Sequence, residues 1–156
     1  MKVLLQRVKG AQVEVNSHIT GRIEKGLLLY VGIGSTDQSA DADWLASKVA
    51  TLRVFEDDQD KLNLSAAEVG GAILAVPNFT LMGDARKGRR PSFSDAAPAP
   101  QAKPLFERFI HRLRESGLRV ETGEFGAHMH ILGVADGPVN IVLDSASAQG
   151  DRPPSQ

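Results

Sequence analysis

The sequence contains no cysteine among its 156 residues. This absence excludes a disulfide framework, a thiolate metal site and a cysteine nucleophile, and it fits the reducing conditions of the cytoplasm. No apolar run approaches the roughly 20 residues that a membrane helix needs, so no membrane partner is expected. The first seven residues alternate like a strand and lack the pattern of a signal peptide.

Neither sign of charge dominates, because 18 Lys and Arg residues face 19 Asp and Glu residues for a net charge of −1. Any contact with nucleic acid must therefore depend on a local basic patch. The hydrophobic content of 42% is ordinary for a globular protein, and the length suits one domain with a substantial core.

Several motifs of catalysis and metal binding are also missing. No Gly-x-Ser-x-Gly elbow supports a serine hydrolase. The glycines of 32–36 lack the lysine of a phosphate-binding loop, and the acidic stretch 56–61 lacks the spacing of a calcium loop, which favours a solvated acidic turn. His128 and His130 would share one face of a strand and could bind a metal, but no further histidine stands at a helpful spacing. We therefore expect neither a metal nor a cofactor.

The apolar pattern predicts a β-rich chain with two helices, which indicates the α+β class. Strands are expected at 2–15 (two strands broken at Lys9-Gly10), 19–23, 27–33 (central and buried), 54–55, 72–79, 118–122 and 129–143. Helices are expected from Thr36 or Asp37 to Leu52, and from about Leu105 to the glycine at 117, after an Ala/Pro-rich connection at 96–101. Residues 1–145 form the predicted domain, and 146–156 are a predicted flexible tail.

Three stretches depart from ordinary patterns. Asp136-Gly137-Pro138 interrupts the last apolar segment, and these residues alone favour a turn between two strands. Pro77 lies inside a buried strand, where it cannot donate to the ladder, so the strand must end, bulge or turn outward there. Arg86-Lys87-Gly88-Arg89-Arg90 concentrates positive charge in a predicted loop, which is either a nucleic acid contact or a solvated turn.

Taken together, these stretches resemble the D-aminoacyl-tRNA deacylase family over about residues 1–145. The resemblance lies in Gln6-Arg7-Val8, Gly26-Leu27-Leu28, Asn78-Phe79-Thr80-Leu81, Arg86 to Asp95, Glu121-Thr122-Gly123, Phe125-Gly126-Ala127-x-Met129 and Asp136-Gly137-Pro138-Val139. The block from Arg86 to Asp95 is the most specific of these motifs.

The resemblance implies a homodimer with a mixed, barrel-like sheet and two main helices. It implies hydrolysis of the ester between a D-amino acid and the 3′-terminal adenosine of tRNA, with glycine mischarged on tRNA as a second substrate. It also implies a cytoplasmic enzyme of translational proofreading.

The same resemblance assigns roles to residues. Pro77, Asn78, Phe79 and Thr80 would form the catalytic segment, with Thr80 a positioning group before it is a nucleophile. Gly137 and Pro138, joined by a cis bond, would reach into the partner's pocket and exclude L side chains. Arg7, Phe125, Ala127 and Met129 would support the pocket, and Lys87, Arg89 and Arg90 would meet phosphates of the tRNA.

Some positions depart from the family pattern. Pro77-Asn78 stands where Ser-Gln is usual, Ala135 replaces an asparagine, Asn140 a threonine, and His128 an acidic residue. Proline at position 77 is similar to a related branch that removes L-alanine from tRNA. Two alternatives follow, a deacylase with relaxed chirality and a module that binds the tRNA end without catalysis.

Overall fold

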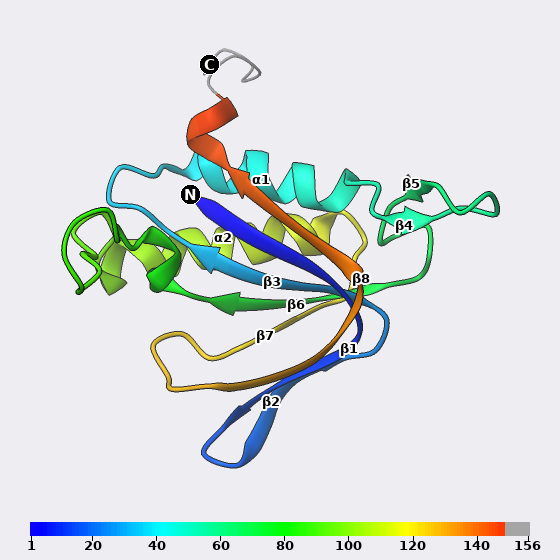
Figure 1. Ribbon diagram of the computed structural model, residues 1–156, viewed down its shortest axis with the longest axis horizontal. Coiled ribbons are helices and arrows are strands. Elements are labelled where there is room, and N and C mark those ends of the chain that lie inside the picture. The colour runs from blue at the N-terminus through cyan, green and yellow to red at the C-terminus, as the bar shows by residue number, and fades with distance from the viewer. Residues whose placement is uncertain (149–156) are drawn as a thin grey trace.

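The computed structural model describes residues 1–148, which form a curved sheet with helices packed on one side (Figure 1). The strands are β1 (Lys2–Val15), β2 (His18–Ile23), β3 (Gly26–Gly32), β4 (Phe55–Glu56), β5 (Leu62–Leu64), β6 (Ala72–Pro77), β7 (Val120–Thr122) and β8 (His130–Asp144). The helices are α1 (Ser39–Thr51) and α2 (Ala99–Glu115), with short 3-10 turns η1 (Phe79–Met82) and η2 (Ser145–Ala148).

The centre of the sheet is β3, which pairs antiparallel with β1 and parallel with β6. β7 extends the sheet parallel to β6. Leu27, Leu28 and Leu29 are at most 1% exposed, because both faces of β3 are covered. The prediction of a central, buried strand is confirmed.

β1 is one strand of 14 residues, so the predicted break at Lys9-Gly10 is wrong. Its first half pairs with β3, its second half pairs with β2, and β8 runs antiparallel along both halves. The register shifts on either side of Val8. Such irregularities bend a strand without ending it, and this bend carries β1 across the fold.

β8 is also one strand, of 15 residues, and not two strands joined by a turn. Opposite Arg7 of β1, residues 136–139 bulge out of the ladder while pairing continues on both sides. We call residues 136–139 the β8 bulge. The Gly137–Pro138 bond within it is cis, as the family resemblance implied. Residues with turn chemistry form a bulge here because β1 offers a partner strand before and after them.

The curved sheet separates two apolar layers. It curls until β2 contacts β6 and β7, and the inner layer within the curl holds Val8, Val13, Leu28, Leu74 and Val76, each at most 1% exposed. The outer layer lies between the sheet and the helices and holds Leu5, Leu29, Leu45, Ile73 and Phe109, all at 0%. The fold is therefore the predicted α+β arrangement of a mixed, barrel-like sheet with two helices.

Both helices start at places that the apolar pattern did not give. α1 begins at Ser39, because the Asp37 carboxylate accepts hydrogen bonds from the Gly34 N–H and the amino terminus and so holds the preceding loop outside the helix. α2 begins inside the predicted connection, with Pro98 as its N-cap and Pro100 in its first turn. Proline is compatible with these positions because the N–H groups there have no partner within a helix.

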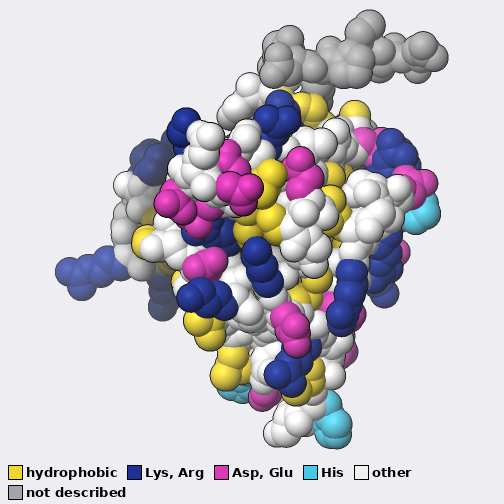
Figure 2. Space-filling view, turned by 90° about the vertical axis from the view of Figure 1, so that its right-hand side faces the viewer, with side chains coloured by type: hydrophobic (Ala, Val, Ile, Leu, Met, Phe, Trp, Pro, Cys, Tyr) yellow, Lys and Arg dark blue, Asp and Glu magenta, His cyan; other side chains and the backbone are white. Residues whose placement is uncertain are grey.

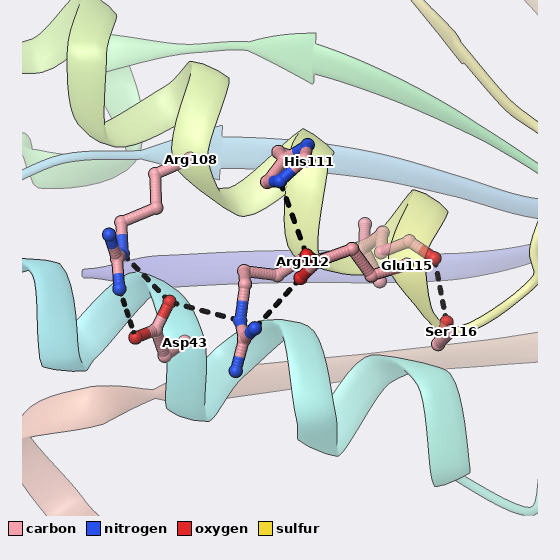
Figure 3. Close-up of polar contacts among 7 residues, drawn as sticks. Asp43, Arg108, His111, Arg112, Glu115 and Ser116 are labelled. Atoms are coloured by element: carbon pink, nitrogen blue, oxygen red, sulfur yellow. Dashed lines mark hydrogen bonds and ion pairs between the residues drawn. The ribbon is translucent and has the colours of Figure 1, made fainter.

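Ion pairs join the exposed faces of the two helices (Figure 3). The Asp43 carboxylate of α1 accepts hydrogen bonds from Arg108 Nε at 2.8 Å and Nη2 at 2.6 Å, and it lies 3.4 Å from Arg112 Nε. Arg112 also pairs with Glu115 at 2.7 Å. Exposed pairs contribute only about 0–1 kcal/mol each, so the apolar layer beneath supplies most of the stability.

The remaining segments close the ends of the fold. The acidic stretch 56–61 forms the turn of the β4–β5 hairpin, where Asp57 accepts hydrogen bonds from two backbone N–H groups that lower its pKa. The first residues of the predicted tail instead form η2, in which Ala148 is 5% exposed, and 149–156 lie outside the described residues. Within residues 1–148 no helix is long and apolar enough to cross a membrane.

The close approach of β3 to β6 gives a test of this packing. A Cβ at Gly26 would lie 1.8 Å from the Ala72 carbonyl oxygen, whereas a Cβ at Gly10 would lie 3.6 Å from that of Ile23. We expect Gly26→Ala to lower the free energy of unfolding by about 3 kcal/mol or more, and Gly10→Ala to change it by less than about 1 kcal/mol. Urea unfolding measures both, and equal losses would contradict the packing described here.

Candidate active site

The carboxyl ends of the parallel strands β3 and β6 open into a cavity of about 540 Å³. One wall is the segment from Pro77 to Thr80, and another is the segment from Phe125 to Met129. The structure therefore brings together two predicted segments that lie far apart in the sequence. A cavity of this size is in the range of small-molecule sites.

β6 ends at Pro77, which is one of the three outcomes expected there, and the predicted strand 72–79 was two residues too long. Pro77 is the last residue of the strand in register with β3, and the next N–H, of Asn78, donates to the Val31 carbonyl at 2.8 Å. The Asn78 side chain then caps η1, because its Oδ1 accepts hydrogen bonds from the N–H of Thr80 at 3.1 Å and from the Thr80 hydroxyl. The chain thus turns sharply at the cavity and is held there by one side chain.

These bonds decide which groups are free to act. The Thr80 N–H is occupied by Asn78, whereas the Phe79 N–H has no hydrogen-bond partner within residues 1–148. The Thr80 hydroxyl donates its proton to an amide oxygen, which is not a base that could activate it as a nucleophile. It keeps lone pairs that can accept a hydrogen bond. This geometry favours Thr80 as a positioning group and Phe79 N–H as an oxyanion donor.

The cavity is almost free of charge. Its lining includes no Lys, Arg, Asp or Glu, and its titratable side chains are Tyr30 and His128. The His128 ring meets that of His130 edge to face, with centroids 5.3 Å apart. Among the described residues no group of three or more His, Cys, Asp or Glu side chains could hold a metal ion. Among the described residues, the lining therefore offers backbone groups, hydroxyl and amide side chains and one imidazole.

The structure does not bring Gly137 and Pro138 to the cavity of their own chain, since neither lines it. Their neighbour Arg7 pairs with Leu27 of β3, whereas Pro77 pairs with Val31. Leu27 and Val31 are four residues apart on β3, so Arg7 and Pro77 are separated by roughly 13 Å along the strand direction. The β8 bulge and the cavity therefore lie toward opposite ends of the sheet.

Arg7 holds the β8 bulge in place. Its side chain is 4% exposed, and its guanidinium donates to the carbonyls of Val54 at 2.8 Å and Asp136 at 3.1 Å and to the Glu56 carboxylate at 3.2 Å. The Asp136 carboxylate lies 3.5 Å from Arg7 Nε. The contact that the resemblance implied between Arg7 and the bulge is thus present.

The basic loop stands beside the mouth of the cavity. Reciprocal hydrogen bonds of 2.8 Å between the backbones of Asp84 and Ser92 close the loop. The Phe93 ring meets the Phe79 ring edge to face, with centroids 5.2 Å apart. The guanidinium of Arg86 lowers the pKa of Asp84 to about 2, so this cation is already paired. Lys87, Arg89 and Arg90 are exposed and have no ion-pair partner within the described residues.

No motif marks some of the lining residues. Tyr30 lies within the predicted buried strand 27–33, yet it lines the cavity. The alternation of β3 contained the information, because Leu28 and Tyr30 share one face. The sequence alone does not show that this face becomes a wall of the cavity where the inner layer ends.

Comparison with known sequences gives consistent matches. The model of a family described as "D-Tyr-tRNA(Tyr) deacylase" matches residues 4–144. A Thermotoga petrophila protein named D-aminoacyl-tRNA deacylase is 52% identical over 146 residues, which covers 94% of this chain and 98% of the relative. An Anaeromyxobacter dehalogenans protein of the same name is 54% identical over 145 residues, covering 93% and 97%.

Comparison with solved structures supports the fold. A protein described as "c-Myc DNA Unwinding Element Binding Protein" superposes with a TM-score of 0.86 at 34% identity, covering 92% of this chain and 98% of the other. A probable eukaryotic D-amino acid tRNA deacylase superposes with a TM-score of 0.79 at 20% identity, covering 91% and 97%. The second likeness bears on the fold alone.

Proposed function

We propose that this chain, which belongs to the D-aminoacyl-tRNA deacylase family, hydrolyses the ester between a D-amino acid and the 3′-terminal adenosine of tRNA. The observation that carries the proposal is the uncharged cavity that joins Pro77–Thr80 to Phe125–Met129, within the family match at 4–144. Glycine mischarged on tRNA is a second substrate, because glycine has no side chain for a chiral filter to reject. With aminoacyl-tRNA as its substrate, the enzyme works in the cytoplasm.

The cavity suits the hydrolysis of an ester that is already labile. Water attacks the ester carbonyl carbon, and the bond from that carbon to the ribose 3′-oxygen breaks, releasing the free amino acid and tRNA. The Phe79 N–H stabilises the developing oxyanion, and the Thr80 hydroxyl positions a reactant. The family resemblance implies that the 2′-hydroxyl of the terminal ribose, and not a side-chain base, relays the proton to the leaving oxygen. The lining fits this role because it offers no carboxylate or amine, and its one imidazole, of His128, meets the His130 ring.

Turnover of defined substrates tests this function. We expect hydrolysis of D-Tyr-tRNA and Gly-tRNA, with L-Tyr-tRNA and L-Ala-tRNA cleaved at least roughly 100-fold more slowly. Release of the labelled amino acid measures each rate. Turnover confined to L-Ala-tRNA would favour the relaxed-chirality alternative that Pro77 suggests. Tight tRNA binding with no turnover on any of the four substrates would favour a binding module.

The active enzyme is a homodimer in which each cavity receives the β8 bulge of the other copy. Three observations support this arrangement. The bulge cannot reach the cavity of its own chain. The outer edge of β8 has no strand partner within residues 1–148. Leu132, Val134 and Val142 on β8 are 52%, 61% and 68% exposed, which is costly unless a second surface covers them. A two-fold dimer would bury one such strand against another.

A substitution in the bulge tests its part in chiral selection. Gly137 has φ +135, and a Cβ there would lie 2.7 Å from Val139 N, so Gly137→Ala must displace the bulge. We expect L-Tyr-tRNA hydrolysis to rise by about tenfold or more, which corresponds to about 1.4 kcal/mol of lost discrimination, while D-Tyr-tRNA hydrolysis changes little. Single-turnover rates on both substrates measure the change, and circular dichroism checks folding.

Mixed dimers then show whether the bulge acts across the subunits. Gly137→Ala chains are co-expressed with an excess of chains whose cavity is disabled by Phe79→Pro, which removes the backbone N–H, together with Thr80→Ala. In a mixed dimer the intact cavity faces an intact bulge, so the ratio of L to D hydrolysis should fall back toward the wild-type value. A ratio equal to that of the Gly137→Ala homodimer would place the filter within one chain.

The basic loop contacts the tRNA backbone. Its free cations project near the cavity mouth, whereas on the face at the other end of the sheet cations and anions are interspersed (Figure 2). Phosphate contacts of this kind position RNA without reading its sequence.

Salt dependence tests the basic loop. Replacing Arg89 and Arg90 together by Ala should weaken tRNA binding and reduce the slope of log Kd against log salt by about 1.5, because two phosphate contacts are lost. Arg86→Ala is the matched control, since Asp84 already pairs with that cation, and it should change the slope less. An unchanged slope in the double variant would show that the loop is only a surface turn.

A further inference from the structure

Tyr30 is the chain's single tyrosine, and its side chain forms part of the cavity wall. We propose that the Tyr30 hydroxyl hydrogen-bonds the terminal adenosine of the bound substrate and fixes its position in the cavity. The inference rests on the proposed function and names the group that orients the nucleoside, a role that neither the motifs nor the comparisons assign.

The position of Tyr30 on the sheet points its ring toward the cavity. Tyr30 pairs with Leu4 of β1 and with Val76 of β6, one residue before Pro77 ends the strand. It lies on the same face of β3 as Leu28, which is buried in the inner layer. The ring packs against that layer but is itself only partly buried. The inner layer therefore ends, and the cavity begins, at the side chain of Tyr30.

The hydroxyl is available to a ligand. The Tyr30 side chain makes no hydrogen bond to another group within residues 1–148. Burial raises the pKa of the phenol above its ordinary value of 10.0, so the hydroxyl stays protonated near neutral pH and can both donate and accept. A partly desolvated hydroxyl without a partner is costly, and a bound polar ligand would remove that cost.

The adenosine is the part of the substrate that fits this wall. The polar side chains of the catalytic segment, Asn78 and Thr80, hydrogen-bond to each other at the exposed η1 turn. In the proposed function, the ester lies at this turn. The neighbours of Tyr30 on the inner side, Val76, Met129 and Ile131, are apolar. The amino acid side chain differs from one substrate to the next, whereas the ester, the α-amino group and the terminal adenosine are common. With the ester at η1, the α-amino group lies one carbon from the ester carbonyl, so the adenosine is the common part that extends away from η1, and its ring nitrogens accept and its amino group donates.

Tyr30→Phe is the informative variant because it removes the hydroxyl and keeps the ring, and with it any stacking on the base. The probe is 3′-deoxy-3′-(D-tyrosylamino)adenosine, in which an amide replaces the scissile ester. We expect its Kd, measured by calorimetry, to rise about three- to tenfold in Tyr30→Phe, as for the loss of one neutral hydrogen bond. The affinity for free adenosine, measured by competition with this probe, should fall by the same factor.

Two readouts separate this role from a structural one. The melting temperature of Tyr30→Phe should equal that of the wild type, and on D-Tyr-tRNA the KM should rise while kcat changes less than about twofold, because the lost contact acts in substrate binding. Thr51→Val removes an exposed hydroxyl at the end of α1, which bonds only to carbonyls of its own helix. This control should leave the Kd of the probe unchanged.

Three results would overturn the assignment. Equal binding of the probe by wild type and Tyr30→Phe would remove any role of the hydroxyl. Weaker binding of the probe with unchanged binding of adenosine would place the contact on the amino acid instead. Failure of the wild type to bind the probe at all would overturn the proposed function together with the Tyr30 assignment.

Discussion

The buried guanidinium of Arg7 is the interaction on which the shape of the β8 bulge depends. A buried cation is costly unless its donors are satisfied. Here the carbonyls of Val54 and Asp136 and the carboxylates of Glu56 and Asp136 surround it. These groups come from two separate parts of the chain and Arg7 comes from a third, so satisfying one side chain fixes the bulge against β1 and the segment that enters the β4–β5 hairpin. The register of the bulge is thereby set by electrostatics as well as by strand pairing.

The same constraint separates the chain's two functional elements. Arg7 anchors the bulge near the start of β3, whereas the cavity forms at the end of β3, where Pro77 stops β6. Proline can end the strand there because the N–H of the next residue, Asn78, makes the last bond to β3. A single copy thus carries a cavity and a bulge that do not meet. The proposed two-fold dimer would resolve this separation, because one contact between copies would supply a bulge to both cavities.

The sequence predicted the elements that depend on local pattern and missed those that depend on partners. The buried β3 follows from its apolar run, and the missing proline donor marked an irregularity at Pro77 without deciding between an end, a bulge and an outward turn. The continuity of β1 and β8 did not, because the residues that make turns also make bulges, and only a neighbouring strand decides between them. The start of α2 was missed because prolines at 98 and 100 are typical both of a connection and of a first helical turn.

The candidate site divides in the same way. The family resemblance grouped Pro77–Thr80 with Phe125–Met129, and the cavity contains both segments. No spacing in the sequence could have grouped them, since their proximity arises from the parallel pairing of β6 and β7 and from the loop that follows β7. Tyr30 has no motif around it and lies in an apolar strand. Its role could be inferred only once the inner layer was seen to end beside it.

The departures from the family pattern have a physical consequence at the catalytic turn. Asn78 stands where a longer glutamine is usual, and its short side chain bonds back to Thr80 two residues later, as asparagine does in turns. This bond occupies the Thr80 N–H, whereas the N–H of the lining residue Phe79 has no partner within residues 1–148. Proline at 77 restricts the backbone just before this turn, so Pro77 and the Asn78 cap together hold the main chain at the start of η1. A site whose donors are backbone groups responds to small shifts of the whole segment. In the proposed dimer, selectivity therefore depends on how rigidly η1 and the bulge of the other copy are held, and not on a charged side chain of the cavity lining.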